Sequence, residues 1–352
     1  MGNRRLIAYS DEIQNKEKQL VLRILSKYNL EVINISRMRS AYKIETSSGN
    51  YCLKRLNHGK YKPRNGSMLI DDLAANGFNL TAKYFKTKDG YFYVKHKKSF
   101  FYLMEWIDGE ECTLNDLDEV LNCVKLLAKF HLSACNLDTN KYKIRNNLKN
   151  WPKIFNSNLT DLDRFKKLIQ KKKLKSNFDL SYYDYIDSFY NRGLVSLSFL
   201  NSSYYYKLSK NAEENKTICH DSFYYQNILK KGSDYYIIDL DSIMIDLQIN
   251  DLGKLIRRIM YKKTYQWDFD KVRQIIEAYS SVKKVSKEEL EVMLALIIFP
   301  HKFWKLGKKR YLRHKNWSEA KYEHKLTKLV RYNELQQKFL DDYLEYLNKF
   351  DH

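Results

Sequence analysis

The sequence predicts an α+β protein with two parts, a β-rich N-terminal region of residues 1–105 and a largely helical region of residues 106–352. Short apolar runs separated by turn residues dominate the first region, which is typical of strands. Apolar residues at i, i+3 and i+4 spacing dominate the second, which is typical of helices. A chain of 352 residues is long enough to divide into two such lobes.

The composition indicates a globular protein, with 44% hydrophobic and 30% charged residues and only 3 Pro and 11 Gly. The net charge is +21, but Lys and Arg are spread over the whole chain. The densest run, residues 166–175, has no interleaved aromatic residues on which bases could stack. We therefore expect no specific nucleic-acid binding, and a solvated basic surface that attracts phosphates or acidic partners.

The cysteines show neither disulfide nor metal spacing. The five residues are Cys52, Cys112, Cys123, Cys135 and Cys219. Their odd number and apolar neighbours favour buried free thiols, which suits a reducing cytosol. The absence of a CxxC pair gives no indication of a zinc site. The opening MGNRRLIAYS has no apolar core after its charges, so it predicts no signal peptide. The longest apolar run, residues 292–299, is too short to span a membrane.

The N-terminal region begins with a helical pattern from Asp11 to about Tyr28. Three strand-like runs follow, residues 31–35, 41–46 and 51–56. Lys54 lies among apolar residues in the third run. A lone strand lysine is usually an edge or snorkelling residue, although it could also grip phosphate groups.

The loop between the first two strands reads Ser-Arg-Met-Arg-Ser and has no glycine, so its backbone cannot be expected to close over phosphates. Arg37 and Arg39 could substitute only as point charges. A short helix is expected over residues 68–75, where Asp71 and Asp72 are the only acids. One of them is expected to pair with Lys54.

A second hairpin is expected over residues 91–95 and 100–106, and it ends in LMEWIDGEE. Apolar sequence there gives way to an acidic turn, which predicts the crossing between the two lobes. Backbone groups from Glu105 to Ile107 could bond an adenine edge, with Met104 and Trp106 as apolar walls.

Helical patterns follow this crossing. Thr113 is expected to cap a helix of residues 114–134, and a capping box at Ser286 and Glu289 is expected to begin another. The remaining predicted helices cover residues 149–174, residues 182–208 with an interruption at Gly193, a helix opened by Asp251, and residues 322–350.

The stretch Ile218–Asp241, ICHDSFYYQNILKKGSDYYIIDLD, carries the candidate chemistry. Two apolar runs flank a Lys-Lys-Gly-Ser-Asp turn and predict a short hairpin. The hairpin should bring Asn227, before the first strand, towards Asp239, at the end of the second. An amide oxygen and a carboxylate, with water and phosphate completing the shell, suit Mg²⁺. An ordinary hairpin with a solvated acidic end is the alternative.

Protein kinases hold their metals with such an Asn and Asp, and their catalytic loop reads His-x-Asp followed five residues later by Asn. His220 fits this pattern, but the residue five places before Asn227 is Ser222, and the acid is one place earlier, at Asp221. The base that accepts a substrate proton is therefore either displaced to Asp221 or absent.

These motifs, in this order, resemble the aminoglycoside phosphotransferase-like branch of the protein kinase fold. Within it, CHDSFYYQNIL and IIDLDSIMIDLQINDLGKLIRR resemble the CotS-type spore coat proteins. The resemblance implies a two-lobed fold that binds ATP with Mg²⁺. Lys54 would grip phosphates, Asn227 and Asp239 would bind the metal, and His220 and Asp251 would shape the loop in which Ser222 occupies the catalytic position.

Two functions remain open at this stage. The protein is either a phosphotransferase that uses MgATP on a small hydroxyl or amine substrate or a coat component, or a weak or dead kinase that binds coat proteins as a scaffold. Family resemblance implies synthesis in the mother-cell cytoplasm followed by assembly into the spore coat. Losing a general base costs about 10²–10⁴-fold in rate, so Ser222 predicts slow turnover more than none.

Overall fold

The structure is a computed structural model, and it describes residues 14–350. The start of the helix expected from Asp11 and the stretch MGNRRLIAYS lie outside these residues. The chain forms two compact units. The first contains residues up to Cys112 together with Thr139–Ile144 and Tyr224–Ile243, and the second contains the remaining segments.

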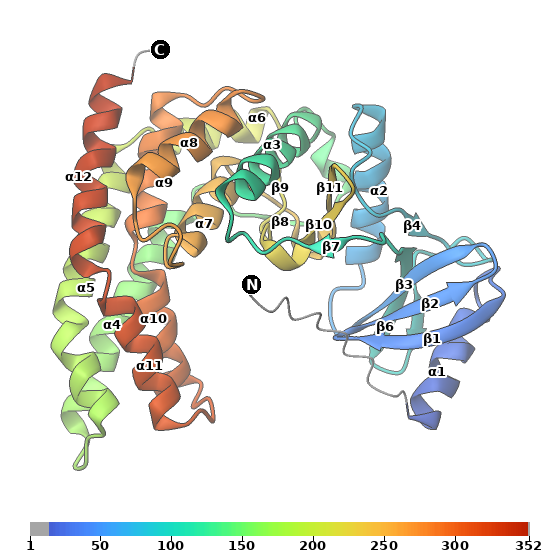
Figure 1. Cartoon of the computed structure of the whole chain (residues 1–352), viewed down its shortest axis with the longest axis horizontal. Helices are drawn as coiled ribbons and strands as arrows, with labels where there is room; N and C mark the ends of the chain where they lie inside the picture. Colours follow the sequence, from blue (N-terminus) through green and yellow to red (C-terminus); the bar gives the residue numbers. More distant parts are fainter. Residues whose placement is uncertain (1–13, 351–352) are drawn as a thin grey trace. The chain divides into compact units, whose positions relative to one another are not determined.

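An antiparallel sheet forms the larger part of the first unit (Figure 1). Its strands run in the order β1-β2-β3-β6-β4, and β5 pairs separately with β6. The expected meander and the second hairpin are thus confirmed. The strands are β1 (Val32–Met38), β2 (Ala41–Thr46), β3 (Gly49–Leu56), β4 (Tyr84–Phe85), β5 (Val94–His96) and β6 (Ser99–Glu105).

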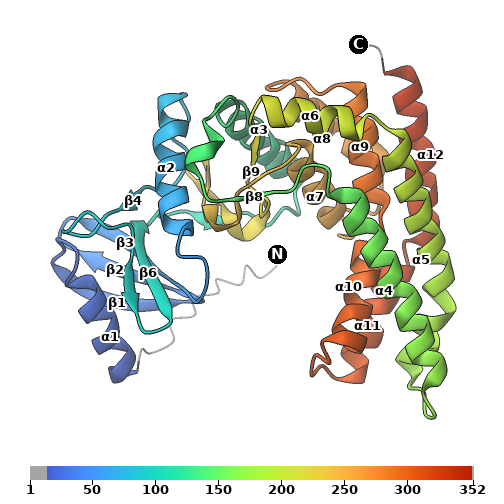
Figure 2. The ribbon, with the colours of Figure 1, turned by 180° about the vertical axis from the view of Figure 1, so that it is seen from behind.

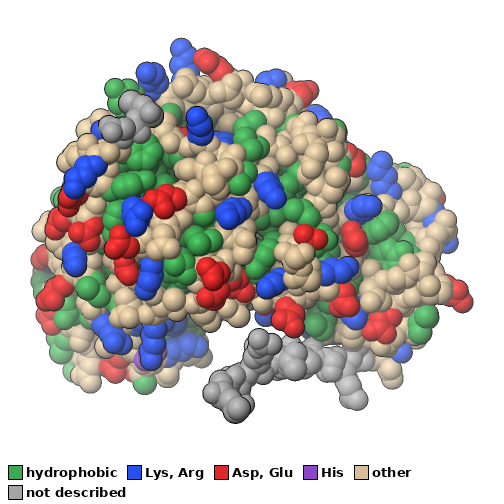
Figure 3. Space-filling view, turned by 45° about the horizontal axis from the view of Figure 1, so that its top comes forward, with side chains coloured by type: hydrophobic (Ala, Val, Ile, Leu, Met, Phe, Trp, Pro, Cys, Tyr) green, Lys and Arg blue, Asp and Glu red, His purple; other side chains and the backbone are tan. Residues whose placement is uncertain are grey.

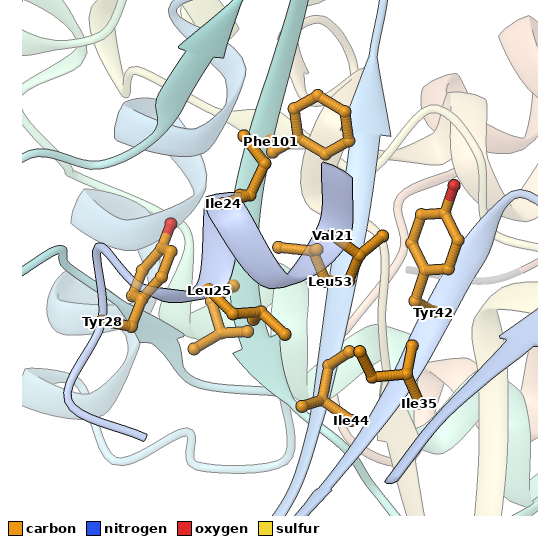
Figure 4. Close-up of a cluster of buried hydrophobic side chains, with 10 residues drawn as sticks. Val21, Ile24, Leu25, Tyr28, Ile35, Tyr42, Ile44, Leu53 and Phe101 are labelled. Carbon is orange, nitrogen blue, oxygen red and sulfur yellow. The ribbon is translucent and has the colours of Figure 1, made fainter. Parts of the chain in front are cut away.

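Helix α1 (Asn15–Leu25) closes one face of this sheet, because its apolar residues recur at helical spacing. Val21, Ile24 and Leu25 are buried against strand residues that alternate inward, including Ile44 and Leu53 (Figure 4). This cluster fixes the face of β3 and therefore the direction in which Lys54, one residue after Leu53, must point.

The first unit also contains α2 (Lys62–Ala75) and a small sheet in the order β11-β10-β7. Helix α2 begins six residues before the expected start because Pro63 is well placed in a first helical turn. The expected hairpin of the motif stretch is confirmed as β10 (Ile228–Lys231) and β11 (Asp234–Ile237), and β10 also pairs with β7 (Glu110–Glu111).

The second unit is mostly helical (Figure 2). Asp116, not Thr113, caps α3, since its side chain accepts from the Glu119 N–H. The capping box at Ser286 and Glu289 is confirmed. The helices are α3 (Leu117–Ser133), α4 (Trp151–Lys171), α5 (Asn177–Ser202), α6 (Tyr205–Glu214), α7 (Ile249–Ile259), α8 (Phe269–Ser280), α9 (Lys287–Ile298), α10 (His301–Gly307), α11 (Glu319–Val330) and α12 (Asn333–Lys349).

Two helix predictions were wrong in detail. Helix α5 continues through Gly193 without interruption. The glycine instead serves packing: a Cβ there would lie 2.5 Å from the Leu159 side chain, so its absence lets α4 and α5 pack closely. The expected helix of residues 322–350 is divided into α11 and α12 at Arg331 and Tyr332, where the buried Tyr332 ring packs edge-on against Tyr261.

A three-stranded sheet holds the motif segments of the second unit together. β12 (Met244–Ile245) pairs with β8 (Arg145–Asn146) and with β9 (Ile218–Cys219), in the order β8-β12-β9. The pairing of β9 with β12 anchors the chain just before His220. Among the described residues, no helix has the length and apolar character needed to cross a membrane.

Candidate active site

Lys54 forms the centre of the candidate site in the first unit. Its Nζ lies 2.5 Å from Asp239 Oδ1 and 2.8 Å from Asp241 Oδ2. Burial opposes its charge, but attraction to the two carboxylates outweighs burial and raises the pKa of Lys54. Lys54 is therefore a charged ammonium held between two acids, as the phosphate-binding hypothesis requires, and it is not an exposed edge lysine.

Asp241 is held from the opposite side by Tyr102. The Tyr102 hydroxyl donates to both Asp241 oxygens, at 2.9 and 3.0 Å, and the Tyr102 ring stacks on Tyr84. Burial raises the pKa of Asp241, against the lowering effect of Lys54. The aromatic pair and the ammonium thus fix this carboxylate in a mostly buried position.

The expectation that Asp71 or Asp72 pairs with Lys54 was wrong. Asp72 binds Lys141 at 2.5 Å and accepts from the Tyr142 hydroxyl. Helix α2 therefore uses this acid to fasten the segment Thr139–Ile144, and Asp241 supplies the second carboxylate for Lys54.

Asn227 and Asp239 lie at neighbouring positions of the β10-β11 hairpin. The Asn227 carbonyl accepts from the Ile238 N–H at 3.0 Å, which brings the residue before Asp239 against Asn227. Asn227 is buried, and Asp239 has a left-handed backbone with φ of 66°. Such strained positions cluster at functional sites.

The donor set fits Mg²⁺, which prefers oxygen ligands and keeps several waters or phosphate oxygens. Asn227 and Asp239 provide an amide oxygen and a carboxylate. The described residues contain no group of three or more His, Cys, Asp or Glu suited to a metal. A metal held here would therefore need oxygens from water or a nucleotide, which is the arrangement expected of a MgATP site.

The segment after β6 is expected to meet an adenine edge. The Glu105 N–H donates to the Lys83 carbonyl at 2.8 Å, and the Trp106 N–H donates to the Asn50 carbonyl at 3.1 Å. These two N–H groups already have acceptors. An adenine bound at this segment would therefore have to accept from the N–H of Ile107. Ile107 is buried, which suits a nonpolar wall beside a base.

The arginines of the β1-β2 loop bind carboxylates. Arg39 Nη1 lies 2.6 Å from Glu111 Oε1, and Arg37 Nη1 lies 3.5 Å from Glu17 Oε2. Arg39 also has a positive φ of 56°, where a glycine would be the usual residue. These contacts weaken the suggestion that the two arginines act as free charges for phosphates.

The candidate catalytic loop belongs to the second unit, and Asp251 of α7 shapes it. Asp251 Oδ2 accepts from the His220 N–H at 2.7 Å, and Oδ1 accepts from the Asp221 N–H at 2.8 Å. The Ser222 N–H donates to His220 Nδ1 at 3.2 Å. Loop residues 220–222 are thus held through their backbones by one buried carboxylate and one imidazole.

A second histidine, His131, also contacts the Asp251 carboxylate. His131 Nε2 lies 3.1 Å from Asp251 Oδ2, and His131 Nδ1 lies 2.7 Å from the Tyr279 hydroxyl. Burial lowers the pKa of His131, which favours a neutral ring that donates to Asp251 and accepts from Tyr279. Burial would raise the pKa of Asp251, but the hydrogen bond from His131 and neighbouring positive charge lower it.

Asp221 and Ser222 differ in their surroundings. Asp221 has a left-handed backbone with φ of 63°, and its carboxylate forms an ion pair with Lys254 of α7. Arg145 Nη2 lies 4.0 Å from its other oxygen. The carboxylate therefore lies between cations and is partly exposed, while Ser222 keeps the position five residues before Asn227.

Sequence reasoning missed several residues of this site. Asp241 could have been found from its place two residues after Asp239 in IIDLD, and Lys254 from its place one helical turn after Asp251. His131 and Tyr102 carried no local signal, because their partners lie far away in the chain. A lone histidine or tyrosine in an apolar element is usually a core residue.

The fold is that of known phosphotransferases. An aminoglycoside phosphotransferase from Alicyclobacillus acidocaldarius matches with a TM-score of 0.82 and 19% identity, covering 94% of this chain and 96% of that one. Spectinomycin phosphotransferase APH(9)-Ia, solved with ADP and spectinomycin, matches with a TM-score of 0.63 and 14% identity, covering 94% and 99%. The expected kinase-like α+β fold is confirmed.

Sequence relatives point to the spore coat. Spore coat protein S of Bacillus subtilis (strain 168) is 25% identical over 343 residues, which are 95% of this chain and 96% of the relative. Residues 22–343 match the model of the family described as "Spore coat putative kinase YutH". The chain therefore belongs to this family of kinase-like spore coat proteins, as its motifs predicted.

Proposed function

We propose that this protein binds MgATP and transfers the terminal phosphoryl group to a hydroxyl or amine of an acceptor in the spore coat. The observation that supports this most is the ammonium of Lys54 held between Asp239 and Asp241. A buried ammonium beside two carboxylates provides both signs of charge that a metal–triphosphate complex needs.

The residues of the first unit would share the nucleotide. Lys54 would bind phosphate oxygens, Asn227 and Asp239 would hold Mg²⁺, and the segment from Glu105 to Ile107 would meet the adenine. Mg²⁺, when bound, would neutralise the charge of the phosphate groups. The chain has a residue for each of these roles. What it lacks is the glycine-rich loop that closes over the phosphates in other kinases.

In the transfer itself, the acceptor oxygen or nitrogen forms a bond to the γ-phosphorus, and the bond from that phosphorus to the β–γ bridging oxygen breaks. ADP leaves with the electron pair of the broken bond, and the acceptor loses one proton. If the loop keeps the register set by Asn227, Ser222 stands at the position of the base, is too weak to accept this proton, and leaves it to solvent. If the register is shifted by one residue, the Asp221 carboxylate would accept it. The products are the phosphorylated acceptor, ADP and one proton.

The family and the B. subtilis relative support a location in the spore coat. Two solved proteins of this fold were crystallised with a nucleotide and a second compound: a spectinomycin phosphotransferase with ADP and spectinomycin, and an amicoumacin kinase with AMP-PNP, Ca²⁺ and Ami. For this protein we propose the same division of work between a nucleotide and an acceptor, in a cell that is building a spore.

A coat scaffold with little or no turnover is the second candidate function. The placement of Ser222 at the usual position of the base favours it, as does the absence of glycine from the β1-β2 loop. Under this proposal the Lys54 site would still bind a nucleotide, but the bound form would serve to dock coat proteins.

Thermal unfolding with and without MgATP tests the shared part of both proposals. A ligand at about 100 times its Kd stabilises a protein by about 2.7 kcal/mol, so millimolar MgATP should raise the Tm. Asp239→Ala should remove this response, and Asp72→Ala, which alters a carboxylate away from Lys54, should keep it. No shift in the Tm of the unmutated protein would reject nucleotide binding. If the Tm rises, a measurement of ADP release would distinguish the enzyme from the scaffold.

A further inference from the structure

Cations extend outward from the candidate catalytic loop along α7. Lys254 pairs with the Asp221 carboxylate, and one helical turn later Arg258 Nη1 donates to the Phe223 carbonyl at 3.3 Å. Residues at i and i+4 share one helix face. Two positively charged side chains of α7 therefore border the loop at which an acceptor would have to arrive.

Helix α10 adds further cations beside Arg258. Lys302 Nζ donates to the Arg258 carbonyl at 3.2 Å and lies 3.7 Å from the centre of the Tyr261 ring. Lys305 follows on the same helix and is exposed. We call Lys254, Arg258, Lys302, Lys305 and Lys328, the last of which lies on α11, the basic cluster.

Positive charges in this cluster repel one another. Burial, with repulsion from Arg257, Lys328 and Arg258, lowers the pKa of Lys302 to about 7. Burial also lowers the pKa of Lys305, with Arg258 and Arg257 adding to the effect. All of the named charges that act on these two lysines are cations.

Within the part of the chain that the structure describes, no carboxylate offsets the charge of the three lysines on α10 and α11. Lys302, Lys305 and Lys328 have no described Asp or Glu within ion-pair distance, whereas Lys308 and Arg310 of the next turn do. From His301 to Lys328 the sequence contains ten Lys and Arg but only two Glu. Blue side chains also gather at the lower left of the surface in Figure 3.

Neighbouring cations without counter-charges are unfavourable, and an anion bound between them removes the repulsion. Lys254 of the cluster pairs with Asp221 and Arg258 bonds the Phe223 carbonyl, so an anion bound by the cluster would lie beside the loop. We propose that the phosphoryl acceptor is itself anionic, carrying a phosphate or carboxylate group that the basic cluster binds while its hydroxyl faces the loop. This inference rests on the proposed function and names its substrate class.

Transfer to such an acceptor forms a bond from its hydroxyl oxygen to the γ-phosphorus of ATP and breaks the bond to the β–γ bridging oxygen. ADP and one proton leave, and the acceptor gains a second anionic group. A cationic acceptor would instead meet repulsion from Lys302 and Lys305. The cluster thus favours an acidic or already phosphorylated hydroxyl compound and rejects an aminated one.

A set of sugars with the same ring and different charge tests this directly. Glucosamine, glucose, glucose 6-phosphate and glucose 1,6-bisphosphate would be titrated into the full chain by calorimetry, without nucleotide. We expect affinity to rise with negative charge and glucosamine to show no binding. Lys305→Glu combined with Lys328→Glu should weaken the bisphosphate by at least about tenfold, because two attractions become repulsions.

Lys171→Glu combined with Lys173→Glu is the matched control. Both residues are exposed, at and just after the end of α4, and the two changes alter the charge by the same amount. This variant should change affinity by less than about twofold. Equal losses in both double variants, tightest binding by glucosamine, or no binding by either sugar phosphate at millimolar concentration would each overturn the proposal. So would a single-stranded RNA that binds the cluster when neither sugar phosphate does.

Lys54→Ala separates this proposal from the proposed function. It should abolish the effect of MgATP on the Tm and leave the binding of glucose 1,6-bisphosphate unchanged. If MgATP never binds but the bisphosphate binds through the cluster, the phosphotransferase proposal fails alone. If MgATP binds and the sugar phosphates do not, the anionic acceptor fails alone.

Discussion

Lys54 Nζ lies 2.8 Å from Asp241 Oδ2, so the strand lysine is paired by a carboxylate of the loop after β11 and by none from helix α2. In protein kinases a helix Glu normally pairs with this lysine. Here Tyr102 donates to the same Asp241 and holds it in place. Asp241 thus positions Lys54 in this chain.

Asp241→Ala should weaken MgATP binding by about tenfold and lower the free energy of unfolding by about 1–3 kcal/mol, because it leaves the buried Tyr102 hydroxyl without its acceptor. Asp241→Asn keeps an acceptor oxygen for Tyr102 and should recover most of the stability but not the nucleotide affinity. Urea denaturation and nucleotide titration would measure the two effects. Equal recovery of both quantities by Asn would contradict the charge pairing.

The two possible registers of the catalytic loop predict opposite results. If Ser222 faces the transferred phosphate, Ser222→Asp should raise ATP turnover by about tenfold or more, and Asp221→Ala should have little effect. If Asp221 is the base, Asp221→Ala should remove activity, and Ser222→Asp should add a repelling carboxylate. From the spacing to Asn227 we expect the first result. An inactive Asp221→Ala beside an active parent would refute it.

Asp246 should matter for stability. Its buried carboxylate accepts from Asn147 Nδ2 at 2.7 Å, Trp151 Nε1 at 3.1 Å and Asn250 Nδ2 at 3.1 Å. Asp246→Ala leaves these donors without an acceptor and should cost about 2–4 kcal/mol in urea denaturation. The exposed pair of Asp163 with Lys167 is the control, and Asp163→Ala should change stability by less than about 0.5 kcal/mol. A cost below that of the control would argue against the network.

His301 should make the protein less stable in mild acid. Burial, with repulsion from Arg257, Lys305 and Lys254, lowers the pKa of His301 to about 2, so the folded protein keeps this ring neutral. In the unfolded chain this histidine has a pKa of about 6.5. Below that pH the unfolded chain therefore holds more protons than the folded protein. The free energy of unfolding should then fall as the pH falls from about 7, by at most about 1.4 kcal/mol per pH unit.

Replacing the ring checks this dependence. His301→Gln should reduce the loss of stability between pH 7 and pH 5, measured by urea denaturation at both values. His314→Gln, at an exposed position, should leave it unchanged. A pH dependence that stays the same in both variants would exclude His301 as its source.

A side chain at Gly307 should destabilise the protein. A Cβ there would lie 2.6 Å from a Phe165 ring atom and against the Tyr182 hydroxyl, two rigid groups. Gly307→Ala should therefore cost about 1–3 kcal/mol. At Gly193 the nearest atom is the end of the flexible Leu159 side chain, so Gly193→Ala should cost less. Thermal unfolding would rank the two variants, and a larger loss at Gly193 would contradict the packing.

Local patterns in the sequence determined much of this protein. The meander up to Lys54, the hairpin with Asn227 and Asp239, and the capping box at Ser286 follow from turn residues, alternation and caps, which act between residues close in the chain. The family was predicted from the same motifs. The roles of the individual site residues remain predictions.

Only the tertiary structure decided which groups meet across long stretches of chain. It paired Lys54 with Asp241, placed His131 under Asp251, and gathered Lys302 and Lys328 without carboxylates. Sequence spacing cannot give these pairs, because they depend on how packed elements bring distant residues together. The partner of Lys54 shows the reason. The sequence suggested Asp71 or Asp72, but Asp72 pairs with Lys141 of the segment Thr139–Ile144, and Asp241 pairs with Lys54.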